Sequence, residues 1–242
     1  MLPQQQGSFP FFRAFGVQVL VHWSWFILPV LVYQGGHHRQ FSSPIWPFIS
    51  LFTVFAIVLM HEFGHALACR SVGGKADKIV LWPLGGVAYV QPPARPGAVL
   101  WSIVAGPLVN LALVPITILA IYAVHDWIPG ASPDVIRYVE WIYMLNLVLL
   151  IFNMLPVYPL DGGQTLQAIL WYFIGRARSL QIVAFIGIVV AIGAGAWAAY
   201  VGDPWFVIMA LFVGMQAYQG WRVAQIMVQV ERQQREQQER WS

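Results

Sequence analysis

The sequence predicts an all-α membrane protein with six transmembrane helices and a short re-entrant β-hairpin between the second and the third. Of its 242 residues, 59% are hydrophobic and only 10% are charged, whereas soluble domains carry roughly 25% charged residues. A helix needs about 20 mostly apolar residues to cross a bilayer, and by that measure six runs can do so. These runs are 17–33, 45–69, 98–124, 136–158, 180–200 and 204–221.

Lysine and arginine residues gather on alternate connections between the predicted spans. Eleven of the 13 lie at the N-terminus, in the second and fourth connections, or after the last span, and only Arg39 and Arg137 lie on the other side. Because loops rich in lysine and arginine stay in the cytoplasm, we expect both termini there and a multi-pass protein of a prokaryotic inner membrane. Residues 1–222 are expected to form one integral-membrane domain, and residues 223–242 a helix leaving the bilayer and a polar cytoplasmic tail.

The connection between the second and third spans is unusually apolar. Its runs Ile79–Trp82 and Val87–Val90 flank Gly85 and Gly86, a pattern typical of a β-hairpin. The hairpin is too short to span the bilayer and too apolar for a plain loop, so we expect it to re-enter the membrane and pack on protein or line a wet cavity. A surface hairpin lying on the bilayer is the alternative. An exposed edge of the predicted re-entrant hairpin could bind an extended peptide by strand addition.

The second span contains the pattern His61-Glu62-x-x-His65. Positions i and i+4 share one face of a helix, so the two imidazoles can bind one metal ion, and Glu62 could move the proton of a metal-bound water. In soluble helices such a pattern also arises as two surface histidines with a stray acid. Ionisable groups in an apolar span are costly unless they pair, bind a metal or line a wet cavity. At about 1.5 Å rise per residue, His61 lies about 13 Å inward from Arg70.

A second polar motif ends the fourth span. Asn153, two prolines and Asp161 follow one another there; the prolines disrupt the helix and free backbone carbonyls that Asn153 could satisfy. Among the ten acidic residues, only Glu62 and Asp161 belong both to an apolar segment and to a polar motif that contains glycine or proline. Because a catalytic zinc usually has three protein ligands and one open position, Asp161 can complete the ligand set begun by the histidines.

Three further residues have structural interpretations beside functional ones. Asn110, in the third span, can hydrogen bond across helices. His22, in the first run, is either a bundle-facing hydrogen-bonding group or a neighbour of the metal. The single cysteine, Cys69, excludes an intrachain disulfide and is interpreted as a small apolar helix residue. The net charge of +3 is spread over loops, which disfavours nucleic acid as a partner.

Together, His61-Glu62-x-x-His65, the segment Gly106–Asn110 and the segment Asn153–Gly162 resemble the three signatures of the site-2 protease family of intramembrane zinc metalloproteases. The resemblance implies that His61, His65 and Asp161 bind zinc and that Glu62 is the catalytic acid and base. It also implies that Asn153 helps to unwind or hold the substrate, with Asn110, Gly85 and Gly86 shaping the site. A bacterial or archaeal type without a PDZ or CBS domain is expected.

The expected function is therefore an intramembrane zinc endopeptidase that cuts transmembrane proteins or peptides in or near the cytoplasmic side of the bilayer. Two alternatives remain open. One is a metal transporter or sensor that uses the same ligands, and the other is a non-catalytic membrane scaffold. The expected partners are the substrate and the lipid bilayer, with no nucleic acid, and a homo-oligomer is left open.

Overall fold

A computed structural model describes residues 7–27, 41–82 and 85–241. They fall in two compact units, one ending at Ile151 and the other beginning at Phe152. The first unit contains β1 (Ser8–Ala14), β2 (Val17–His22), the 3-10 helix η2 (Trp23–Ile27), α2 (Ile45–Ser71), β3 (Lys75–Trp82), β4 (Gly85–Gln91), α3 (Pro96–Tyr122) with its π-helical end η4 (Ala123–Trp127), and all but the last two residues of α4 (Pro133–Asn153). The second contains α5 (Asp161–Ile174), α6 (Arg176–Val201) and α7 (Pro204–Trp241).

Four of the described helices are long and apolar enough to cross a membrane: α2, α3 with η4, α4 and α6, with mean hydropathies between 1.7 and 2.3. The chain is thus a membrane protein, but the count of six spans is not confirmed. The sixth predicted run lies in α7, which is not among these four helices. The first predicted span is wrong over its described part, since Val17–His22 is a β-strand. Residues 28–33 of that span lie outside the described ranges.

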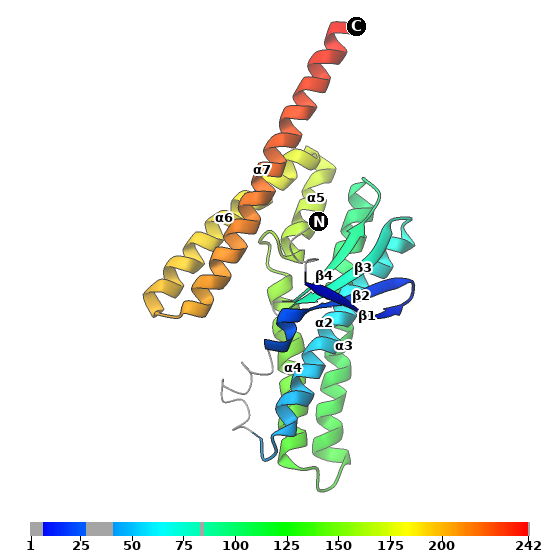
Figure 1. The fold of residues 1–242 in the computed structure, drawn as a ribbon, viewed down its shortest axis with the longest axis vertical. Helices are drawn as coiled ribbons and strands as arrows, with labels where there is room; N and C mark the ends of the chain where they lie inside the picture. Colours follow the sequence, from blue (N-terminus) through cyan, green and yellow to red (C-terminus); the bar gives the residue numbers. More distant parts are fainter. Residues whose placement is uncertain (1–6, 28–40, 83–84, 242) are drawn as a thin grey trace. The chain divides into compact units, whose positions relative to one another are not determined.

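The strands form a four-stranded sheet in the order β1-β2-β3-β4. β2 runs parallel to β3 across the α2 crossover, and the other neighbours are antiparallel. Figure 1 shows the sheet lying against α2. In β2 the valines are buried and alternate with partly exposed residues, the period of two expected for a strand with one face in a core. The described residues are mostly helical, as predicted, but the sheet contains β1 and β2 in addition to the predicted hairpin. These strands were not predicted because a buried strand is as apolar as part of a transmembrane helix.

The core of the first unit lies between this sheet and the C-terminal half of α2. Val19 and Ile79, which face each other across β2 and β3, are fully buried together with Ala66 and Cys69 of α2. The predicted hairpin is present as β3 and β4. Gly85 and Gly86 begin β4 opposite Trp82 and Leu81, and the connecting residues 83 and 84 are outside the described part. Its entry into a bilayer stays a prediction.

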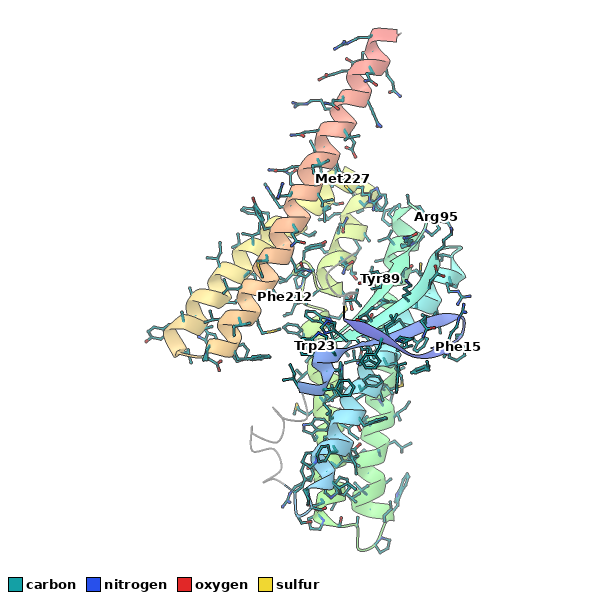
Figure 2. The ribbon with its side chains drawn as sticks, in the orientation of Figure 1. Phe15, Trp23, Tyr89, Arg95, Phe212 and Met227 are labelled. Carbon is teal, nitrogen blue, oxygen red and sulfur yellow. The ribbon has the colours of Figure 1, made fainter. Side chains whose placement is uncertain are left out.

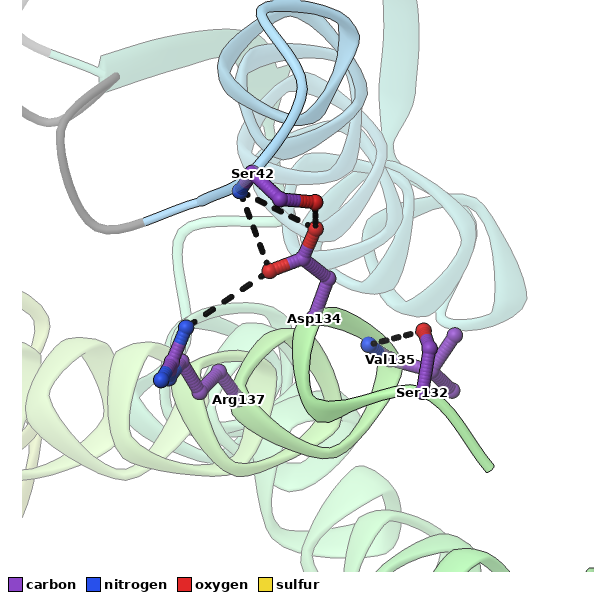
Figure 3. Close-up of polar contacts among 5 residues, drawn as sticks. All are labelled: Ser42, Ser132, Asp134, Val135 and Arg137. Atoms are coloured by element: carbon purple, nitrogen blue, oxygen red, sulfur yellow. Dashed lines mark hydrogen bonds and ion pairs between the residues drawn. The ribbon is translucent and has the colours of Figure 1, made fainter. Parts of the chain in front are cut away.

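Polar contacts fix the start of α4 beside the start of α2, as Figure 3 shows. Asp134, buried in the first turn of α4, accepts hydrogen bonds from the backbone N–H of Ser42 at 3.1 and 3.2 Å and from the Ser42 hydroxyl. Arg137 lies 3.6 Å from the same carboxylate. A carboxylate is also favoured at the positive end of the helix dipole. One turn further along α4, the Tyr138 and Thr53 hydroxyls hydrogen bond.

In the second unit α6 and α7 form a helical hairpin. Gly202 ends α6 in the left-handed conformation with φ 77°, and the Asp203 carboxylate then accepts hydrogen bonds from the first N–H groups of α7. Glycine after a helix, an acidic N-cap and Pro204 at the first helical position favour this turn. Met227, labelled in Figure 2, and Tyr158 both pack on the buried core of this unit. Burial raises the pKa of the Tyr158 phenol.

Candidate metal centre

His61, Glu62 and His65 lie on one buried segment of α2, and each side chain is only 6% exposed. The Nε2 atoms of the two histidines are 3.0 Å apart. This is the arrangement that the i, i+4 spacing predicts. Because α2 is one of the candidate spans, the pair lies in a segment where an ionisable group that binds no partner costs free energy.

Each histidine is oriented by a contact on its other ring nitrogen. Nδ1 of His65 lies 2.9 Å from the backbone carbonyl of Ser102 on α3, and Nδ1 of His61 lies 2.5 Å from Oδ1 of Asn110 on the same helix. A carbonyl only accepts, so Nδ1 of His65 donates and its Nε2 carries the lone pair. Such a bond on the far nitrogen is the usual support of a metal-binding histidine.

The pair fits a metal ion. Two nitrogen lone pairs facing each other repel unless a proton or a cation lies between them. Zinc–nitrogen bonds of about 2.0–2.1 Å at a tetrahedral angle place two ligand nitrogens roughly 3.3 Å apart, close to the 3.0 Å between His61 and His65. A Cβ at Gly106 would lie 2.3 Å from Nε2 of His65 and 2.8 Å from Nε2 of His61. Glycine at this position therefore keeps clear the space in front of both nitrogens.

Glu62 faces a different neighbour, the sheet. Its Oε2 accepts a 2.7 Å hydrogen bond from the backbone N–H of Ala88 in β4. A Cβ at Gly86 would lie 2.4 Å from Cγ of Glu62, so only glycine permits this close approach of strand and carboxylate. Gly85 has no described atom within 4 Å of its Cβ position and a φ of 140°, which indicates a conformational role at the start of β4.

Asp161 and Asn153 belong to the second unit. Asp161 is the first residue of α5, and Asn153 the last of α4. The loop between them is packed tightly on the helix start: a Cβ at Gly162 would lie 2.3 Å from the carbonyl oxygen of Met154, and one at Gly163 2.4 Å from the backbone nitrogen of Tyr158. The local geometry thus holds Asp161 in the first turn of α5. Its assignment as the third ligand stays a prediction.

Sequence reasoning missed three partners of the site. Ser102 and Ala88 act through backbone atoms, which leave no signal in residue type. Asn146 on α4 bonds Asn110 at 2.8 and 2.9 Å; a buried amide within an apolar span is the signal that could have found it. His22, left open between two roles, places Nδ1 2.5 Å from the Ser24 hydroxyl and makes a tilted ring contact with Trp23. A role at the metal stays a prediction.

The fold and the site define a helical membrane protein with a buried pair of histidines suited to a metal ion. Comparison with known proteins agrees with this description. Residues 49–132 and 116–194 match Peptidase family M50, and the chain belongs to this family. A solved structure, the site-2 protease from Methanocaldococcus jannaschii, is similar with a TM-score of 0.65 and 28% identity over 88% of this chain and 95% of that one. The resemblance drawn from the three motifs is confirmed.

Two curated relatives extend the likeness over most of the chain. The zinc metalloprotease MJ0392 of Methanocaldococcus jannaschii is 30% identical over 90% of this chain and 62% of its own length. Rip3 of Mycobacterium tuberculosis is 30% identical over 92% of this chain and 64% of its own length. The chain therefore spans a little over three fifths of the length of these relatives.

Proposed function

We propose that this protein is an intramembrane zinc metalloendopeptidase that hydrolyses peptide bonds of transmembrane substrates in or near the cytoplasmic side of the bilayer. The observation that carries the proposal is the 3.0 Å separation of the two Nε2 atoms, each on a ring whose Nδ1 is held by an oxygen of α3. Membership of family M50 and the zinc metalloprotease named among the relatives support it.

In this proposal His61, His65 and Asp161 hold zinc. When bound, zinc lowers the pKa of water and polarises a peptide carbonyl. Glu62 accepts the proton of the attacking water and delivers a proton to the amide nitrogen that leaves, so that the carboxylate returns to its starting state. The Ala88 N–H holds Oε2 of Glu62, which fixes the side chain in one orientation before the substrate arrives.

The substrate is proposed to bind as an extended strand along β4. This strand is at one edge of the sheet, and its contact with Glu62 brings the edge next to the acid and base. Strand addition supplies backbone hydrogen bonds that do not depend on side-chain identity. Asn153 is proposed to hold backbone groups of the unwound substrate, and the distribution of lysine and arginine supports a cytoplasmic position of the site.

Metal analysis of the purified protein tests this function. We expect one zinc ion per chain in the native protein and in Glu62→Gln, and loss of zinc in His61→Ala, His65→Ala and Asp161→Ala. A native protein without zinc would overturn the proposal. A metal transporter using the same ligands, the alternative, requires zinc flux into proteoliposomes that His61→Ala abolishes and Glu62→Gln does not.

A further inference from the structure

Asn146, on α4, is joined to the candidate metal centre through Asn110 on α3. Both side chains are fully buried. Nδ2 of Asn146 donates to the backbone carbonyl of Asn110 at 2.9 Å, and Oδ1 of Asn146 accepts from Nδ2 of Asn110 at 2.8 Å. Oδ1 of Asn110 in turn lies 2.5 Å from Nδ1 of His61. A continuous set of three hydrogen bonds therefore links a backbone carbonyl to a metal-facing imidazole.

The donor and acceptor of each of these three hydrogen bonds follow from the backbone carbonyl of Asn110. An amide can turn by 180° with little change of shape, which exchanges its donor and its acceptor. The backbone carbonyl of Asn110 only accepts, so Asn146 presents its NH₂ to that carbonyl. Its oxygen then faces the side-chain amide of Asn110. Asn110 must then present its NH₂ to Asn146 and its oxygen to His61. The proton of His61 is thereby placed on Nδ1, and Nε2 carries the lone pair that faces His65.

We propose that Asn146 is a positioning residue of the metal centre, which selects the metal-binding tautomer of His61 through Asn110. The inference rests on the proposed function in that His61 is a zinc ligand. Without Asn146, the Asn110 amide has two orientations, and one of them turns its NH₂ toward Nδ1. That orientation favours the tautomer with the proton on Nε2, which cannot bind a metal through that atom. Burial of both amides keeps bulk water from replacing the missing partner.

Zinc affinity of the detergent-solubilised full-length protein, measured by competition with a chromophoric chelator, tests this role. Asn146→Ala is expected to weaken zinc binding by about 10- to 100-fold, as loss of a group behind a metal ligand does. The matched control is Ile142→Ala, one turn earlier on α4 and beside the same apolar cavity as Asn146. It removes packing without touching the hydrogen bonds and is expected to keep native affinity.

A double-mutant comparison separates tautomer selection from packing. In Asn110→Asp both carboxylate oxygens accept, so no orientation is left to select, and Asn146→Ala should cost clearly less affinity than in the native background. An equal loss in both backgrounds, or native affinity in Asn146→Ala, would overturn the inference while leaving zinc binding and the proposed function intact. If the alanine variant does not fold, Asn146→Leu fills the volume and the same comparison decides. A native protein without zinc would instead overturn the proposed function.

Discussion

The backbone N–H of Ala88 lies 2.7 Å from Oε2 of Glu62, which ties an edge strand of the sheet to the acid of the histidine motif. Ala88 faces Ile79 in the register of β3 and β4, and its N–H points away from β3 toward α2. The carboxylate is thus aligned by the main chain of the hairpin. Any displacement of β4 should move the proton acceptor without moving the two histidines, which are held by α3.

The first prediction uses this separation between the hairpin and the histidines. Gly86→Ala should lower kcat by at least about 10-fold, a part of the roughly 10²- to 10⁴-fold that acid–base catalysis contributes, and leave zinc content unchanged, because the new Cβ would lie 2.4 Å from Cγ of Glu62. Peptide cleavage and metal analysis on one preparation measure both. Gly193→Ala in α6, where a Cβ meets no atom of the described residues within 4 Å, is the control. Native kcat in Gly86→Ala would contradict the role of the strand.

The second prediction concerns the space in front of the histidines. Gly106→Ala should weaken zinc binding by more than about 10-fold, the smallest effect typical of losing a supporting group, because its Cβ would lie within 2.3 Å of Nε2 of His65. Chelator competition measures the affinity. Gly195→Ala, whose Cβ would make an ordinary 3.5 Å contact, should bind zinc as the native protein does. Zinc affinity unchanged in Gly106→Ala would show that the metal does not occupy this space.

The third prediction addresses the packing of α4 on the start of α2. Asp134→Ala should lower the free energy of unfolding by about 1–3 kcal/mol, because the backbone N–H and hydroxyl of Ser42 lose their buried acceptor. Thermal unfolding in detergent measures the change. Arg137→Ala should cost at most about 1 kcal/mol, because its side chain is 57% exposed and an exposed ion pair is weak. Equal losses of unfolding free energy in the two variants would contradict the conclusion that the Asp134–Ser42 hydrogen bonds hold α4 against the start of α2.

Much of the site could be predicted from the sequence because its residues form short, local patterns. The i, i+4 histidines and the hairpin follow from helix and strand periodicity. The first predicted span is wrong over its described part because Val17–His22 is a strand between β1 and β3 with its valines buried. Its pairing with residues about 60 positions later is not revealed by periodicity. The contacts of Ser102 and Ala88 cannot be predicted for the same reason, since each joins a side chain of α2 to a backbone atom of a segment distant in the sequence.

In the proposed function, Glu62 moves protons in a reaction at a zinc ion that the histidines hold. Glu62→Gln keeps the size of the side chain and an oxygen that can accept the Ala88 hydrogen bond. It removes the basicity of the side chain. Native protein and variant should be reconstituted in liposomes with a single-span substrate, and cleavage and zinc content measured together. We expect one zinc ion per chain in both proteins and cleavage slower by about 10²- to 10⁴-fold in the variant. Cleavage at the native rate by Glu62→Gln would contradict it.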